Sequence, residues 1–333
     1  MNDYIVNVPV SITIWKRPNC QKRQWEIIKQ VKPSVLFVFS DGGRNKEEWE
    51  LINQNRKLID EGIDWNCVVY KAYENHNNGL YTMIKKMFAF IWERVDRCIF
   101  LEDDQIPSES FFEYCSILLE RYKNDERIEC ICGMNNVEKW ESCDSDYFFS
   151  KQGSIWGLAT WKRVAQNFWD FSYYKSEYTM KLLKKATKKN KTIWKRLIAY
   201  GKGQYYEGHI AGPEFWLEFD MYFKNTLQII PKYNMINNIG FGDSSEHSRE
   251  LRKLPKRIQK LYNMRTYEID CLSLKHPNSI VNDCNYEKAR NKTLYYNEPF
   301  IVSFFLKILR GIKYFFTDFK YFISKFKRKE KER

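Results

Sequence analysis

Five short apolar runs alternate with longer amphipathic segments over the first 135 residues of the chain. The runs are rich in Val, Ile and Phe, as buried strands are, and lie at 8–15, 34–39, 65–70, 97–101 and 128–133. The segments between them have the apolar spacing of helices and lie at 21–31, 45–60, 80–94 and 109–122. Strands that alternate with helices predict βαβ units around a mostly parallel sheet.

Beyond residue 135 the pattern is less regular, without an internal repeat or a low-complexity linker. A segment bearing Trp and Gly lies at 154–161, and a basic segment lies at 175–202. An acidic and aromatic helix is predicted at 213–225, and a loop rich in Gly and Ser follows at 237–248.

Residues 299–333 differ from everything before them. Phe, Ile and Leu recur there at helical spacing, Lys and Arg fill the gaps, and the chain ends in basic residues. This pattern predicts a cationic amphipathic helix, for which two interpretations are open: docking on the protein's own core, or lying in the interface of an anionic membrane. The abundance of Phe on one face and of positive charge on the other favours the membrane surface.

The net charge of +13 is not spread evenly over the chain. It belongs to the segments 175–202 and 299–333, and the remainder is slightly acidic, so it does not predict a nucleic-acid partner. The nine cysteines form no CxxC pair and indicate reduced, structural thiols. The N-terminus does not resemble a signal peptide, and no apolar stretch is long enough to span a bilayer. We expect a cytoplasmic protein, peripheral on the inner face of the cell membrane.

Polar residues follow three of the predicted strands. Arg17 follows the first strand, Asp41 the second, and the acidic triplet Glu102-Asp103-Asp104 the fourth. The carboxyl ends of parallel strands share one edge of a sheet, and ligands bind there. Topology alone should therefore bring these three groups together.

The acidic triplet ends a buried strand abruptly. Three adjacent carboxylates repel one another, and a divalent cation such as Mn²⁺ or Mg²⁺, which prefers oxygen ligands, would relieve that repulsion. A bare triplet of this kind is more often a solvated acidic turn. The apolar strand before it, and Pro107 with a helix start at 109–114 after it, favour a metal site.

The same region resembles a known family. The stretch IFLEDDQIPSESFFEY at 99–114 is similar to GT-A glycosyltransferases of the N-acetylglucosaminyltransferase I-like group, and to bacterial sugar transferases of surface-polysaccharide synthesis. Five further segments agree in order, so that the resemblance spans about residues 8–248: ITIWKRP at 12–18, FSDGG at 39–43, NGL at 78–80, WGLATWKR at 156–163 and NNIGFGDSSEHS at 237–248.

The resemblance implies an α/β fold of the GT-A type, Rossmann-like, with a mostly parallel central sheet flanked by helices. It implies a glycosyltransferase domain at 1–250, with a donor half at about 1–135 and an acceptor half at about 136–250. An irregular extension at 251–298 and the amphipathic helical tail at 299–333 would follow. The activity it implies is metal-dependent, inverting transfer of a hexosyl or N-acetylhexosaminyl group from a nucleotide sugar, most commonly a UDP-sugar, to a glycan or lipid-linked saccharide acceptor.

Five donor and metal contacts follow from the resemblance. Asp104, the last acid of the triplet, would ligate the metal. Glu102 and Asp103 would contact the ribose or the donor sugar. Arg17 and Asp41 would hold the nucleoside, Asp41 by accepting a hydrogen bond from a base N–H.

Five further positions complete the implied site. Asn78 and Gly79 would lie near the nucleotide. Trp156 and Gly157 would form the floor under the transferred sugar. For His247 two interpretations stand: a metal or phosphate contact from a closing loop, or a loop histidine satisfied by its neighbours.

The family has its catalytic base, an aspartate, at the start of the helix that precedes the strand end at 229–231. This chain reads GPEFWLEFD at 212–220. Counting from the N-terminal side aligns Glu214 with that aspartate, and counting from the C-terminal side aligns Phe215. We choose Glu214, because a carboxylate in the first turn after a proline suits the helix dipole, with two alternatives, Glu218 and Asp220.

Two other functions compete with the transferase. A nucleotidyltransferase also uses a nucleotide-binding α/β sheet, but it usually has a Gly-rich phosphate loop after the first strand, where this chain reads WKRPN at 15–19. A non-enzymatic membrane-surface adaptor would explain the charge but not the polar strand ends. The basic segment 175–202 is either a solvated insertion or a second contact with anionic lipid.

Overall fold

The structure is a computed structural model that describes residues 6–165, 175–187, 190–207, 213–240, 255–296 and 308. The chain forms two compact units, residues 1–294 and 295–333. The expected tail helix at 299–333, apart from residue 308, and His247 lie outside the described residues. Among the helices of the described part, none is long and apolar enough to cross a membrane.

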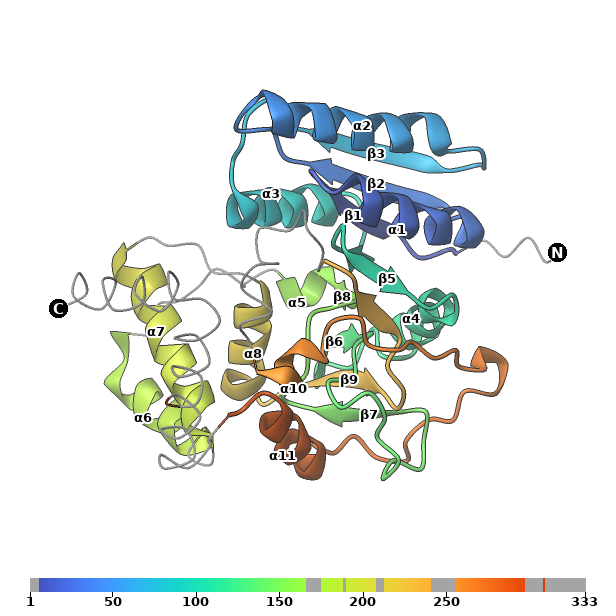
Figure 1. Ribbon diagram of the computed structural model, residues 1–333. Coiled ribbons are helices and arrows are strands. Elements are labelled where there is room, and N and C mark those ends of the chain that lie inside the picture. Colours follow the sequence, from blue (N-terminus) through green and yellow to red (C-terminus); the bar gives the residue numbers. More distant parts are fainter. Residues whose placement is uncertain are drawn as a thin grey trace. The chain divides into compact units, whose positions relative to one another are not determined.

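Strands and helices alternate in the N-terminal half, as predicted (Figure 1). The elements are β1 (Val10–Ile14), α1 (Pro18–Val31), β2 (Val35–Ser40), α2 (Lys46–Gly62), β3 (Val68–Tyr73), α3 (Leu80–Trp92), β4 (Arg97–Leu101), β5 (Gln105–Pro107), α4 (Ser110–Arg121) and β6 (Ile128–Cys132). Helix α1 begins earlier than expected because proline fits a first helical turn. Strand β3 begins later than expected, since Trp65 packs on Trp25 and donates to the carbonyl of Pro33.

The second half supplies further strands and a group of helices. The elements are β7 (Tyr147–Ser150), β8 (Leu158–Trp161), α5 (Lys162–Ala165), α6 (Glu177–Ala186), α7 (Lys191–Glu207), α8 (Pro213–Phe223), β9 (Leu227–Pro231), β10 (Ile236–Asn238), α10 (Lys256–Gln259) and α11 (Cys284–Thr293). The basic segment 175–202 therefore forms α6 and much of α7, and both helices contact α8.

One eight-stranded sheet, in the order β3-β2-β1-β4-β8-β6-β9-β7, runs through the first unit. Strands β1 to β4 are mutually parallel, and β6 and β9 are parallel to each other. Among the described strands of this sheet, only β8 and β7 pair antiparallel with their neighbours. The predicted α/β class with a mostly parallel sheet flanked by helices is confirmed.

Strand β1 lies at the centre of the site-bearing half, between β2 and β4. Ile12 of β1 pairs in register with Val38 of β2 and with Leu101 of β4. All three side chains are buried. The residues that follow these strands therefore leave the sheet along one edge, as the topology argument requires.

The segment 255–294 packs on the rest of the first unit. Tyr286 of α11 is fully buried against Phe148 and Trp140. Asp283 caps α11 and accepts a hydrogen bond from the indole of Trp140 at 2.7 Å. All nine cysteines are free thiols, and those of β4 and β6 are buried in the core.

Candidate functional site

The acidic turn 102–105 follows β4 at the carboxyl edge of the parallel strands. The side-chain amide of Gln24, from α1, donates to the backbone carbonyls of both Glu102 and Gln105. The side chain of Gln105 in turn accepts from the backbone N–H of Gly157 at 2.9 Å. Two buried glutamines thus hold the turn against α1 on one side and against the Trp156-Gly157 segment on the other.

Arg17 neutralises part of the charge of this turn. Its Nη1 lies 2.5 Å from Asp104 Oδ2 and 3.5 Å from Asp103 Oδ1. The two aspartates expose only 8% and 7% of their surface, respectively. Burial, with the charge of Asp104 adding to it, raises the pKa of Asp103 to about 7 against the opposing effect of Arg17. For Arg17, burial lowers the pKa, but the two carboxylates outweigh it and the pKa is raised overall.

A hard divalent cation fits these residues. Two carboxylates share Arg17, so negative charge remains, and carboxylate oxygens are the ligands that Mn²⁺ and Mg²⁺ prefer. In the described part of the chain, no group of three or more His, Cys, Asp or Glu side chains is arranged to hold a metal. The protein would therefore supply one or two carboxylates, and phosphate oxygens and water would take the other positions.

The segment that leads into the expected closing loop touches this cluster. The side-chain amide of Asn238, at the end of β10, donates to Asp104 Oδ1 at 3.0 Å, and the N–H of Ile239 donates to the Asp104 carbonyl. A Cβ atom placed on Gly240 would lie 2.2 Å from Asp104 Oδ2 and 3.0 Å from Arg17 Nη1. A larger residue at 240 would therefore displace the Asp104 carboxylate or the chain itself.

Asp41 organises the loop 76–79. Its carboxylate accepts from the backbone N–H groups of Gly42, Asn78 and Gly79 at 2.9 Å. The side-chain amides of Asn77 and Asn78 add two more hydrogen bonds at 3.1 Å. Asp41, Asn78 and Gly79, all predicted to lie near the nucleoside, are thus brought together, with Asp41 as the shared acceptor.

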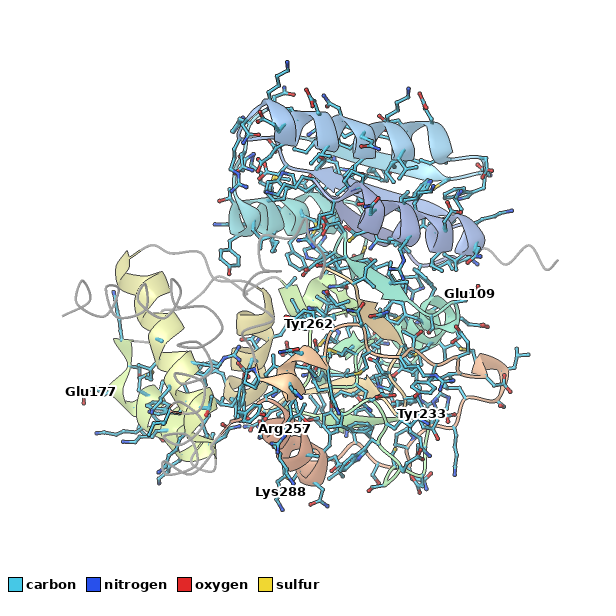
Figure 2. All side chains as sticks on the ribbon, in the orientation of Figure 1. Glu109, Glu177, Tyr233, Arg257, Tyr262 and Lys288 are labelled. Carbon is cyan, nitrogen blue, oxygen red and sulfur yellow. The ribbon has the colours of Figure 1, made fainter. Side chains whose placement is uncertain are left out.

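Trp156 and Gly157 lie beside the acidic turn, to which Gly157 is hydrogen-bonded. Gly157 has a φ of +66°, and a Cβ there would lie 2.4 Å from Ile236. The Trp156 ring packs edge-on against Tyr262, labelled in Figure 2, with centroids 5.0 Å apart. Burial is the main cause of a raised pKa of Tyr262, and the charges of Asp104 and Glu102 add to it, so this side chain lies within electrostatic range of the acidic turn.

The three candidate bases have different places in α8. Glu214 is the second residue of the helix, and Glu218 comes one turn later. Glu218 is buried and ion-paired with Arg196 at 3.2 Å. Asp220 is bonded to Lys224 at 2.6 Å. Lys224 also lies 3.9 Å from the buried Glu129, so Asp220 belongs to a separate cluster between α8 and β6.

Five residues of the site were not predicted from the sequence. Asn238 and Gly240 belong to the Gly- and Ser-rich loop predicted at 237–248, and Gln105 directly follows the acidic triplet. Their positions in the sequence therefore indicate that they lie near the site. Gln24 is a polar residue on a buried helix face, and Tyr262 lies in a segment without a regular pattern. Only the fold brings these last two to the acidic turn.

No family model and no curated protein matches the chain. Solved structures resemble it at low identity. A mannosyltransferase from Pyrobaculum calidifontis, in complex with GDP-Man and Mn²⁺, is 9% identical at a TM-score of 0.38, over 65% of this chain and 69% of that one. A putative glucose-1-phosphate thymidylyltransferase from Bacillus anthracis is 10% identical at a TM-score of 0.37, over 80% and 98%. A UDP-glucose pyrophosphorylase in complex with UDP-glucose is 10% identical at a TM-score of 0.36, over 69% and 91%.

Proposed function

We propose that this protein is a metal-dependent, inverting glycosyltransferase that moves a sugar from a nucleotide sugar, with UDP as the first candidate nucleotide, to a glycan or lipid-linked saccharide. The observation that carries the proposal is the pair of buried aspartates after β4 that share Arg17, at the edge where parallel strands bind ligands. These interactions leave a buried negative charge that a divalent cation, with the phosphates it carries, would neutralise.

Asp104 would hold a divalent cation, which would supply neutralisation of the charge on the leaving pyrophosphate. Glu102 and Asp103 would contact the ribose or the donor sugar. Arg17 offsets part of the charge of the two aspartates before the donor arrives and can pair with phosphate afterwards, since its guanidinium carries several donors in one plane.

The nucleoside would lie against the loop 76–79. The Asp41 carboxylate holds that loop by hydrogen bonds from the backbone N–H groups of Asn78 and Gly79, so its contribution to nucleoside binding is largely to shape the loop. Trp156 offers an aromatic face to the apolar side of a pyranose, and the edge-on ring of Tyr262 restricts how that face is approached.

Transfer requires a base that takes the proton of the acceptor hydroxyl. We assign this role to Glu214, in the first turn of α8. A single base opposite the leaving pyrophosphate implies direct displacement, in which the acceptor oxygen bonds to the anomeric carbon as the C–O bond to phosphate breaks. The configuration of that carbon is then inverted.

The connection after β1 supports the transferase over the nucleotidyltransferase. Strand β1 ends at Ile14 and α1 begins at Pro18, which leaves three residues and no room for a Gly-rich phosphate loop. The proposed membrane contact of residues 299–333 and the proposed metal or phosphate contact of His247 rest on the sequence pattern alone.

Binding of a panel of UDP- and GDP-sugars, with Mn²⁺ and with EDTA, tests the proposal. We expect one nucleotide sugar to raise the melting temperature only with metal present, and we expect this shift to disappear in Asp104→Asn. The matched control is Asp64→Asn, an exposed aspartate that should leave the shift unchanged. The absence of donor binding by the wild type with metal present would refute the proposal, and product analysis then separates transfer from nucleotidyl exchange.

A further inference from the structure

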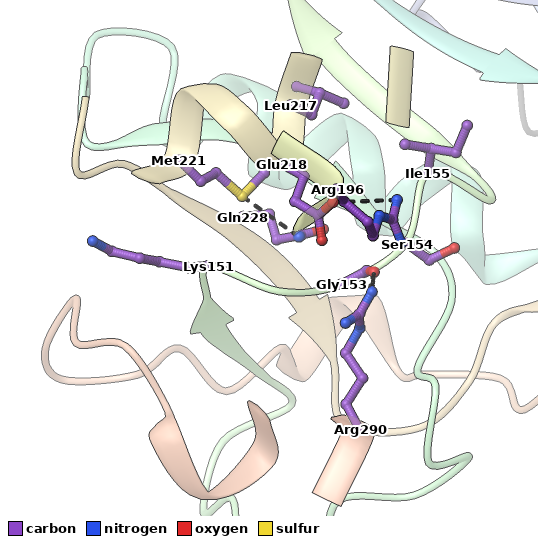
Figure 3. A pocket seen from close by; sticks show the side chains of 10 residues that line it. All are labelled: Lys151, Gly153, Ser154, Ile155, Arg196, Leu217, Glu218, Met221, Gln228 and Arg290. Carbon is purple, nitrogen blue, oxygen red and sulfur yellow. Dashed lines mark hydrogen bonds and ion pairs between the residues drawn. The ribbon is translucent and has the colours of Figure 1, made fainter. Parts of the chain in front are cut away.

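A small cavity beside the Trp156 segment takes part in none of the steps above. Its volume is about 60 Å³, and its lining comes from α7, α8, α11, β9, residue 151 and residues 153–155 (Figure 3). Since about 10–15 Å³ of such space is enough for one water molecule, the cavity has room for hydroxyl-sized groups. Its charged lining consists of Glu218, Arg196, Arg290 and Lys151.

The Glu218 carboxylate is the unusual member of this lining. It is 8% exposed, and within the described part of the chain no donor is placed to hydrogen-bond its Oε2, although Arg196 Nη2 lies 3.2 Å away. Burial raises the pKa of Glu218 in spite of the opposing charges of Arg196 and Arg290. A buried acceptor of this kind gains free energy from any ligand that brings it a proton donor.

The combination of one carboxylate with two guanidinium groups selects the chemistry of the ligand. An anion without a proton, such as a carboxylate, could pair with the basic groups but would leave Glu218 Oε2 without a donor, while a cation would be repelled by Arg196, Arg290 and Lys151. An apolar group would leave the polar lining without new partners. A hydroxyl group can donate to the carboxylate and accept from a guanidinium at once.

The cavity also adjoins the proposed floor of the sugar site. Ser154 and Ile155 line it, and the N–H of Trp156 donates to Ser154 Oγ at 3.2 Å. Arg290 approaches from α11 and bonds the carbonyl of Gly153, so the same short segment joins the cavity to the floor.

We propose that this cavity is a subsite for a hydroxyl group of the acceptor saccharide, with Glu218 as hydrogen-bond acceptor and Arg196 as donor. The assignment of the hydroxyl group to the acceptor saccharide rests on the proposed function, whereas the hydroxyl-binding chemistry of the cavity does not. Arg196 belongs to the basic segment 175–202, and the proposal gives that segment a part in substrate recognition.

Saccharide binding to the full chain tests the subsite without any transfer step. The probes are methyl glycosides of common hexoses and N-acetylhexosamines, titrated with UDP and Mn²⁺ present and followed by saturation-transfer NMR and calorimetry. We expect at least one glycoside to bind, and its affinity to fall about tenfold in Glu218→Gln and in Arg196→Gln, as the loss of a hydrogen bond to a charged group implies. The control is Lys195→Gln, which removes one positive charge as Arg196→Gln does, at an exposed neighbouring position on α7. This variant should bind like the wild type.

Monodeoxy analogues of the bound glycoside separate recognition from a structural effect. Removal of the hydroxyl that enters the cavity should weaken binding to the wild type and cost nothing further in Glu218→Gln. Equal losses of affinity for the deoxy analogue in the wild type and in Glu218→Gln would refute the subsite. So would a glycoside affinity that neither Glu218→Gln nor Arg196→Gln changes, and the cavity would then hold only water. Glycoside binding without nucleotide binding would support the subsite and refute the proposed transferase. Nucleotide binding without any glycoside binding would refute the subsite and leave the proposed transferase standing.

Discussion

A guanidinium nitrogen of Arg17 lies 2.5 Å from a carboxylate oxygen of Asp104, across a separation of 87 residues in the sequence. The two residues follow β1 and β4, which are neighbours in the sheet. Their contact therefore depends on the parallel pairing of these strands, and it makes the charge balance of the candidate site a direct product of the topology.

Replacement of Arg17 by methionine should destabilise the protein. The substitution keeps much of the side-chain volume but leaves Asp103 and Asp104 without their shared cation, and we expect a loss of about 3–5 kcal/mol in the free energy of unfolding. Urea denaturation measures it. Arg23→Met, an exposed position on the same helix, should change the free energy by no more than about 0.5 kcal/mol. Mn²⁺ should recover part of the loss in Arg17→Met, and equal losses in the two variants would contradict the role of the pair.

Alanine at Gly240 should impair the site more than the fold. The added methyl group would lie 2.2 Å from Asp104 Oδ2, so either the carboxylate or the chain at 240 must move. We expect affinity for the nucleotide sugar with Mn²⁺ to fall by about tenfold or more, with near-native circular dichroism. Calorimetric titration of wild type and variant measures the change, and an unchanged affinity would show that the cluster tolerates the displacement.

Asparagine at Asp41 tests whether this carboxylate shapes the loop 76–79. The amide would turn an NH₂ group toward backbone N–H donors and lose hydrogen bonds to Asn78 or Gly79. Amide hydrogen exchange at 77–79 should accelerate about tenfold even without ligand. Asp64→Asn serves as the control. Unchanged exchange together with weakened nucleotide binding would instead point to direct contact with the base.

Glutamine at Glu214 should lower kcat without weakening donor binding. Loss of a general base costs about a hundredfold to ten-thousandfold in rate, while the affinity for the nucleotide sugar depends on other residues. Steady-state kinetics and donor titration separate the two, and Glu177→Gln, exposed on α6, is the matched control. A similar loss of kcat in Asp220→Asn and not in Glu214→Gln would assign the base to Asp220.

Glu129 should give the protein a stability that increases toward acid. Burial, together with the charge of Asp220, raises the pKa of Glu129 to about 7 from the ordinary 4.5, while Lys224 and Thr226 oppose the shift. The folded protein then binds the proton more tightly than the unfolded chain. Its free energy of unfolding rises as the pH falls from about 7 to about 4.5, by at most about 3 kcal/mol.

Urea denaturation at about pH 5 and about pH 8 of wild type and Glu129→Gln measures this contribution. The variant should lose the Glu129 part of the pH dependence, and exposed Glu126→Gln should retain it. The same pH dependence in wild type and Glu129→Gln would mean that the carboxyl titrates normally in the folded protein.

The alternating pattern of the first half was enough to predict its strands and helices, because parallel strands buried on both faces read as continuous apolar runs. Strands β7 and β8 are four residues long each and carry no such run, so the antiparallel insertions in the sheet were not predictable. Polar residues at strand ends indicated Arg17 and Asp104. The partners that complete the site, Gln24 and Tyr262, come from segments whose docking no local pattern encodes.

The bonds of Gln24 to the carbonyls of Glu102 and Gln105 have a kinetic consequence. Each closes a loop of more than 70 residues, as does the contact of Arg17 with Asp104, and contacts of such sequence separation form late because loop closure is entropically costly. A refolding chain should therefore acquire helical structure before it acquires affinity for nucleotide. The binding of a nucleotide during refolding would then report the final step, in which β4 docks beside β1 and the acidic turn takes its shape.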